Sequence, residues 1–113
     1  MNRIYKIALY CLIILGTIHS TFTLFLYKTL NVDALWFFGT GLTYIFMGLY
    51  NLAAIKVRIK SISNIAVILN FIGTIFTIAI TYILKEPQAY IAMVIVIFIF
   101  VFSVMSAIGS IKK

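Results

Sequence analysis

The chain has 113 residues, of which 65% are hydrophobic and 10% are charged, and its formal net charge is +7 at pH 7. Soluble domains contain about 45–50% apolar residues, so this composition excludes an ordinary soluble domain and indicates a membrane protein. The basic residues are confined to short segments between apolar runs. That distribution argues against a nucleic-acid partner and for contact with the lipid bilayer.

Charged residues leave four uncharged runs, at 7–27, 34–55, 61–84 and 87–111. Roughly 20 helical residues cross a hydrocarbon core of about 30 Å, so each run can form one transmembrane helix. We therefore expect an all-α polytopic membrane protein in which residues 1–113 form a single domain. Its helices are predicted at about 5–27, 34–55, 61–84 and 88–111, packed as an antiparallel four-helix bundle.

The charges also predict how the helices are oriented in the membrane. Seven basic residues fall on one side of the four spans: Arg3, Lys6, Lys56, Arg58, Lys60, Lys112 and Lys113. The other side carries Lys28 and Lys85 together with both acidic residues, Asp33 and Glu86. The positive-inside rule then places both termini and the middle loop in the cytoplasm of a multi-pass cell-membrane protein, in bacteria an inner-membrane protein. No small-x-small cleavage site follows the first span, which we expect to be retained.

The first two predicted helices each carry small and polar residues on one face. In the first helix these residues are Leu12, Gly16, His19, Ser20 and Thr23, at spacings of three and four. In the second they are Gly41, Tyr44, Gly48 and Asn51, flanked by Thr40 and Thr43. Gly16 and Ser20 form a small-xxx-small pair, which lets another backbone approach closely. Because a short turn joins the two helices, we expect a hairpin with the two faces in contact.

Several residues are expected to mark helix ends. Asp33 is predicted to cap the second helix, since a carboxylate is favoured at the positive end of a helix. Trp36, one turn further on, lies at the depth of an interfacial aromatic anchor. Ser61 or Ser63 is predicted to cap the third helix, and Pro87 suits the first turn of the fourth.

The third and fourth predicted helices differ in polarity. The third has the most regular polar face, formed by Ala66, Asn70, Gly73, Thr77 and Thr81. The fourth is almost wholly aliphatic and aromatic as far as Phe102, and we expect it to be the helix most exposed to lipid. The three polar faces of the other helices favour self-association or a membrane partner subunit.

His19 is the chief candidate for a functional residue, because an ionisable side chain within a membrane is costly and usually faces a bundle interior or a cavity. Three interpretations are open. Nearby threonines or Asn70 can satisfy a neutral imidazole, or the ring can handle a proton or solute, since it titrates at about pH 6.5 in water. It can also ligate a metal or haem, which would need His19 from two subunits or a methionine such as Met47 or Met93.

Other chemistry has little support. The sequence has no second histidine, and no carboxylate lies within the predicted spans, so our leading expectation is a protein without a metal or cofactor. No serine can be activated by a histidine that is itself oriented by a buried acid. Glycine loops of the kind that bind phosphate are absent. We therefore expect that the protein is not an enzyme.

A second candidate set consists of Tyr44, Asn51 and Asn70. These residues can line a polar path together with Thr40, Thr43, Thr74 and Thr77. They can equally serve as interhelical hydrogen bonds, which contribute about 0.6 kcal/mol each in membrane bundles. Both interpretations are open.

Two segments resemble small uncharacterised four-helix bacterial integral membrane proteins. They are Gly16-x-x-His19 and Asp33-Ala34-Leu35-Trp36-Phe37-Phe38, the latter followed by glycine-rich sequence that ends at Gly48-x-x-Asn51. The resemblance covers about the first half of the chain and implies the four-helix fold with no known activity. The length and four-span layout are also similar to the small multidrug resistance transporters. Their coupling depends on a glutamate in the first helix, which this chain lacks, so that mechanism is not expected here.

Our leading hypothesis is a non-enzymatic, oligomerising membrane bundle that binds or passes a small solute or a proton. The predicted site residues are His19, Thr23, Thr40, Tyr44, Asn51, Asn70 and Thr77. Two alternatives are an accessory membrane protein, whose polar faces only pack against partners, and a dimeric b-type haem protein.

Overall fold

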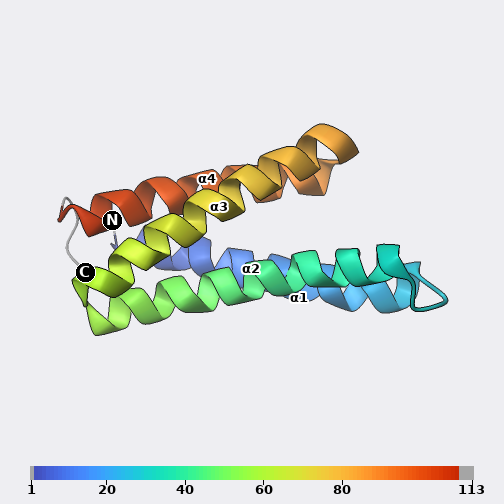
Figure 1. Cartoon of the computed structure of the whole chain (residues 1–113), viewed down its shortest axis with the longest axis horizontal. Helices are drawn as coiled ribbons and strands as arrows, with labels where there is room; N and C mark the ends of the chain where they lie inside the picture. The colour runs from blue at the N-terminus through green and yellow to red at the C-terminus, as the bar shows by residue number, and fades with distance from the viewer. Residues whose placement is uncertain (1, 110–113) are drawn as a thin grey trace.

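The structure is a computed structural model that describes residues 2–109. It contains four α-helices in this range: α1 (Asn2–Leu26), α2 (Val32–Val57), α3 (Lys60–Leu84) and α4 (Pro87–Ala107) (Figure 1). Each helix is long and apolar enough to cross a membrane. The predicted all-α architecture, with four helices that are each able to span a membrane, is therefore confirmed.

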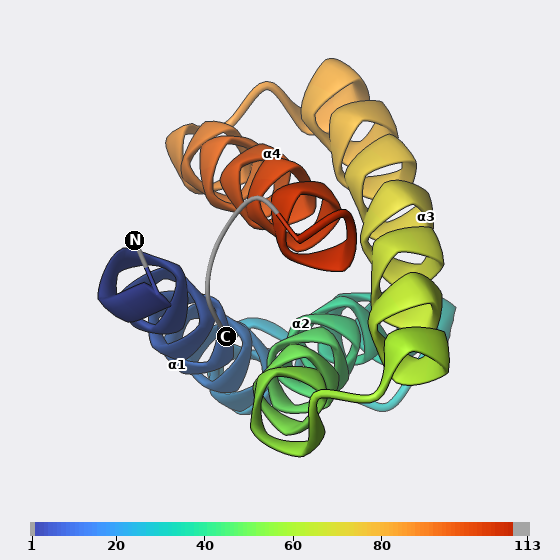
Figure 2. The same cartoon turned by 90° about the vertical axis from the view of Figure 1, so that its left-hand side faces the viewer.

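The helices follow one another in a ring, each antiparallel to the next, as the view along the bundle shows (Figure 2). The most extensive packing joins α1 to α2 and α3 to α4, whereas the α1–α4 and α2–α3 contacts are narrower. The bundle is therefore built from two tightly packed hairpins, α1–α2 and α3–α4, that meet along a smaller interface.

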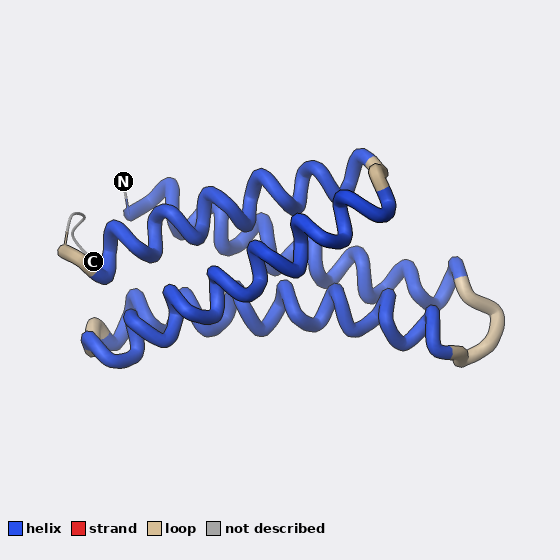
Figure 3. The backbone as a smooth tube through the Cα atoms, turned by 45° about the horizontal axis from the view of Figure 1, so that its top comes forward, coloured by secondary structure: helices blue, strands red, loops and turns tan. Residues whose placement is uncertain are grey.

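The two ends of the bundle differ. The turns of both hairpins, at 27–31 and 85–86, lie at one end, which we call the hairpin end. Arg3, Lys6 and the α2–α3 loop with Arg58 lie at the opposite end, which we call the basic end. The hairpins diverge toward the hairpin end, where their two turns stand apart in both views (Figures 1 and 3).

The α2 helix begins earlier than predicted and has a different cap. Asn31 is its N-cap, and the Oδ1 of this residue accepts a 2.8 Å hydrogen bond from the backbone N–H of Ala34. The predicted cap at Asp33 is therefore wrong. Asp33 instead lies in the first turn, where its carboxylate still interacts favourably with the helix dipole.

The remaining helix ends are set mainly by the backbone. Ile59 is the N-cap of α3 and forms no side-chain cap bond, so the predicted caps at Ser61 and Ser63 are wrong. The left-handed conformation of Arg58, with φ 57°, ends α2. Pro87 occupies the first turn of α4 as predicted, but this helix ends at Ala107 rather than near residue 111, which lies outside the described residues.

The prediction that α4 is the helix most exposed to lipid is wrong. Within its most apolar stretch 39% of the residues are buried, against 28% for each of the other three helices. Small residues such as Ala89 and Ala92 let α4 pack closely, and Val96 and Ile99 are fully buried in the core. A helix that is apolar on all sides can bury any face without leaving a polar group unpaired, so its lack of a polar face does not imply exposure.

The facing small residues of α1 and α2 are confirmed as a close backbone contact. A Cβ atom on Gly16 would lie 2.5 Å from the carbonyl oxygen of Gly41, and a Cβ on Gly41 would lie 2.5 Å from that of Gly16. Ser20 strengthens the contact, because its hydroxyl donates a 2.9 Å hydrogen bond to the carbonyl of Phe38. Gly16, Ser20 and Gly41 thus hold the first hairpin together.

This contact predicts that Gly41→Ala lowers the free energy of unfolding by about 1–3 kcal/mol, because the added methyl group forces two backbones apart. Gly39→Ala is the matched control, since no atom lies within 4 Å of a Cβ at that position. Alanine also favours a helix interior over glycine, so this control should be neutral or slightly stabilising. Unfolding in mixed micelles with increasing SDS measures both variants, and equal stabilities would contradict the close contact.

Candidate functional site

A cleft opens between the two hairpins at the hairpin end. Its first lobe has a volume of about 630 Å³ and lies between α2 and α3. The residues that line it are His19, Tyr27, Asp33, Trp36, Phe37, Thr40, Ile80, Ile83 and Leu84. Volumes of roughly 300–1,000 Å³ are typical of sites that bind small molecules.

A second lobe lies on the other side of the same aromatic group, next to α1 and the start of α4. Its volume is about 650 Å³, and it is lined by Leu15, Ile18, His19, Phe22, Leu26, Tyr27, Phe37, Glu86 and Gln88. Three residues, His19, Tyr27 and Phe37, line both lobes. His19 therefore stands at the centre of the cleft.

His19 is held in place by Phe37 of the neighbouring helix. The imidazole stacks on the Phe37 ring with centroids 3.8 Å apart and 15° between the planes. It is also hydrogen-bonded to the backbone of Phe37. Tyr27 extends this aromatic group, since its ring centroid lies 5.7 Å from that of Phe37. The histidine is half-buried, so part of the ring remains accessible from the cleft.

Both acidic residues of the chain line the cleft. Asp33 borders the first lobe and Glu86 the second. Gln88 donates a hydrogen bond to the Glu86 carboxylate and lines the same lobe. Tyr27, Phe37 and Glu86 were not predicted as site residues. One feature of the sequence could have indicated this site. Both acidic residues fall on the sparsely charged side of the four spans, next to the turns of the two hairpins.

A second polar group lies deep in the bundle and joins three helices. Asn51 of α2 and Asn70 of α3 exchange two amide hydrogen bonds, each 2.8 Å long. Tyr5 of α1 donates a 2.9 Å hydrogen bond to Asn51 Oδ1, and Asn51 also donates to the Met47 carbonyl. Both asparagines are fully buried. Asn51 thereby uses both amide hydrogens and two acceptor positions of its oxygen.

A third polar contact lies two helical turns closer to the hairpin end. The Tyr44 and Thr77 hydroxyls are hydrogen-bonded at 2.8 Å, and Thr77 also bonds the Gly73 carbonyl. Met47 fills the space between this contact and the asparagine pair, since its Sδ would be 2.9 Å from a Cβ on Gly73. Buried apolar packing thus separates the two polar contacts.

The predicted site residues therefore fall into four places rather than one. His19 and Thr40 line the cleft. Inside the bundle, Asn51 pairs with Asn70, and Tyr44 pairs separately with Thr77. Thr23 is buried and is not among the residues that line either lobe, and its hydroxyl has no hydrogen-bond partner among residues 2–109. Trp36 is 68% exposed and lines the cleft, and its role as an interfacial anchor remains a prediction.

Within the described range, no three His, Cys, Asp or Glu side chains come together as a metal site would require. Comparison with protein-family models, curated proteins and solved structures finds no match to this chain. What is established is a small multi-pass membrane protein with four antiparallel helices and a cleft at one end.

The amide pair predicts strong coupling between Asn51 and Asn70. In a Tyr5→Phe background, Asn51→Leu or Asn70→Leu alone leaves the other amide buried without its partner, which costs about 1–3 kcal/mol. The double variant should cost less than the two single variants added together, by about 1 kcal/mol. Unfolding in SDS measures this cycle, and Asn64→Leu, at an exposed position of α3, is the control. If the free-energy changes of the two single variants sum to that of the double variant, the two amides do not interact and the prediction is wrong.

Proposed function

We propose that this protein is a non-enzymatic membrane bundle that binds a small solute in the cleft around His19. The observation that carries the proposal is the pair of large lobes that meet at His19. They have volumes of about 630 and 650 Å³ and open at the hairpin end. A cleft bounded by both hairpins can take a ligand without any rearrangement of the helices.

The cleft faces the outside of the cell in this proposal. Described basic residues that include Arg3, Lys6 and Arg58 lie at the opposite end, and the positive-inside rule assigns that end to the cytoplasm. The sequence adds Lys112 and Lys113, which lie outside the described residues. A solute would therefore enter from the outer aqueous phase or sideways from the outer half of the bilayer.

The lining of the cleft indicates the kind of solute it accepts. Aromatic side chains such as Tyr27, Trp36 and Phe37 offer flat apolar surfaces, and His19 adds a polar ring at the centre. A carboxylate at each lobe, from Asp33 and Glu86, favours a positive charge. Aromatic faces also attract cations, by about 0.5–2 kcal/mol. A partly apolar solute that bears a basic group fits this lining.

Passage of a solute or proton would require a second arrangement of the hairpins. Met47 and the Asn51–Asn70 pair close the bundle below the cleft, and both asparagines are fully buried. Binding is therefore the proposal supported by this arrangement, and passage would follow only if the hairpins separate at the basic end.

A second candidate is an accessory protein whose cleft receives a helix from a partner or from a second copy. The two hairpins diverge at the hairpin end (Figures 1 and 3). Exposed apolar side chains of both hairpins, such as Phe22 and Ile83, line the cleft there, which favours this candidate. A competition experiment separates the two candidates. If a partner helix already fills the cleft, an added small molecule should displace nothing from it.

Trp36, the only tryptophan of the chain, gives a direct test of binding. In nanodiscs of zwitterionic lipid, 4-bromobenzyltrimethylammonium should quench its fluorescence and reach saturation. Phe37→Ala and His19→Ala should weaken this binding at least several-fold, whereas Phe46→Ala, which removes an exposed aromatic residue outside the cleft, should not. Quenching that rises linearly without saturation would mean simple partition into lipid and would contradict a cleft site.

The same assay tests the role of the carboxylates. With 4-bromobenzyl alcohol as the neutral counterpart, the wild-type protein should bind the cation more tightly. Asp33→Asn combined with Glu86→Gln should remove this preference, because it removes both negative charges from the lining. A preference that survives the double substitution would exclude the two carboxylates as its source.

The orientation can be measured by cysteine labelling in whole cells. In a Cys11→Ser background, a membrane-impermeant thiol reagent should label Thr29→Cys, at the hairpin end, without lysis. Ile59→Cys, in the loop of the basic end, should react only after lysis. The reverse pattern would place the cleft on the cytoplasmic side.

A further inference from the structure

A small polar cavity lies at the basic end, far from the cleft, and all four helices line it. Its volume is about 10 Å³, and a cavity of roughly 10–15 Å³ holds one water molecule. Hydroxyl groups come from Tyr5 of α1, Ser63 of α3, and Ser103 and Ser106 of α4, while Ala54 of α2 contributes to the wall. The cavity is therefore the right size for one water and is surrounded by polar partners.

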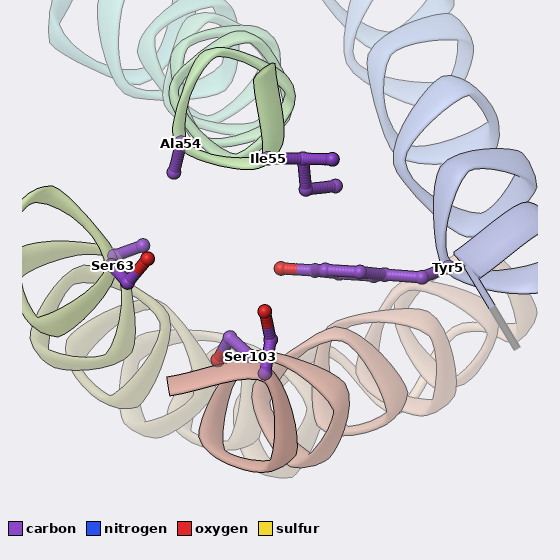
Figure 4. A pocket seen from close by; sticks show the side chains of 7 residues that line it. Tyr5, Ala54, Ile55, Ser63 and Ser103 are labelled. Carbon is purple, nitrogen blue, oxygen red and sulfur yellow. The ribbon is translucent and has the colours of Figure 1, made fainter. Parts of the chain in front are cut away.

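The hydrogen bonds already formed show which groups face this cavity as acceptors. Tyr5 donates its hydroxyl proton to Asn51 Oδ1 at 2.9 Å, and Ser103 donates its own to the Phe100 carbonyl at 2.8 Å. Each group therefore presents only lone pairs to the cavity. Figure 4 shows the Tyr5 hydroxyl directed into the space between the helices, with Ser63 across that space and Ser103 beside it. Two such acceptors cannot bond each other directly, and a water molecule between them would supply the donor.

We propose that one ordered water molecule occupies this cavity and donates hydrogen bonds to Tyr5 Oη and Ser103 Oγ. Buried waters usually form about three hydrogen bonds, and the Ser106 hydroxyl in the lining offers a third partner. The water extends the Tyr5–Asn51–Asn70 network to α4, so that one continuous set of hydrogen bonds joins all four helices. This inference does not depend on the solute proposed for the cleft.

Charge favours water over a metal cation in this position. No carboxylate lines the cavity. The surrounding end of the bundle carries Arg3, Lys6, Lys56, Arg58 and Lys60. A cation would be repelled by these groups and would meet only neutral oxygens, whereas a water needs no charge compensation. Every lining residue lies within about two turns of a helix terminus, so water can enter from the headgroup region.

A crystal structure of the full chain in lipid, at a resolution that shows ordered solvent, tests the proposal directly. The expected result is a single water within hydrogen-bonding distance of Tyr5 Oη and Ser103 Oγ. A direct Tyr5–Ser103 hydrogen bond, an empty cavity or a metal ion with short oxygen contacts would each overturn it.

Variants give a second, independent measurement. Ser103→Ala combined with Ser106→Ala removes the α4 partners, so the water should be lost and the melting temperature should fall by several degrees. Ser61→Ala is the matched control, because Ser61 is exposed near the same end. A double variant that keeps both the water and the wild-type melting temperature would contradict the bridging role of α4.

Discussion

The reciprocal amide pair between Asn51 and Asn70 is the interaction on which the arrangement of the two hairpins depends. Each hairpin is held internally by extensive helix packing, but the contact between hairpins is narrow. Apolar contact alone gives little preference for helix–helix packing over helix–lipid packing in a bilayer, because lipid tails offer the same apolar surface to an exposed leucine or isoleucine. A buried amide, by contrast, is costly unless it is paired. The pair therefore fixes both the depth and the rotation at which α2 meets α3, and Tyr5 joins α1 to the same point.

The cleft follows from where this polar anchor lies. The hairpins are joined at the level of Asn51 and Asn70, and the Tyr44–Thr77 bond holds them again two turns further on. Beyond that level no interhelical hydrogen bond between α2 and α3 is found among residues 2–109, and the hairpins diverge (Figure 1). The space between them is filled in part by the stacked His19 and Phe37 rings. The hairpins that these polar contacts join thus leave the bundle open at the hairpin end.

Much of the fold was predictable because it depends on properties that a sequence displays directly. Span length and the positions of charges predict four helices, and the spacing of Gly16, Ser20 and Gly41 predicts the face that joins α1 to α2. The caps were not predictable in the same way, since Asn31 and Asp33 are both good capping residues and only the helix start decides between them. The burial of α4 also escaped prediction, because an apolar helix carries no polar face to mark which side packs inward.

The candidate site shows the limit of grouping residues by polarity alone. Membrane-embedded polar residues can serve either to stabilise the bundle or to bind a ligand, and the two roles differ in how many of their hydrogen bonds are already used. Asn51 uses both amide hydrogens and accepts two bonds, so it has no capacity left for a solute. His19 is half-buried beside a large cleft, where part of its ring remains accessible. That difference is three-dimensional, because it depends on which neighbour each side chain meets, and it narrows the predicted set of site residues to those around His19 at the hairpin end.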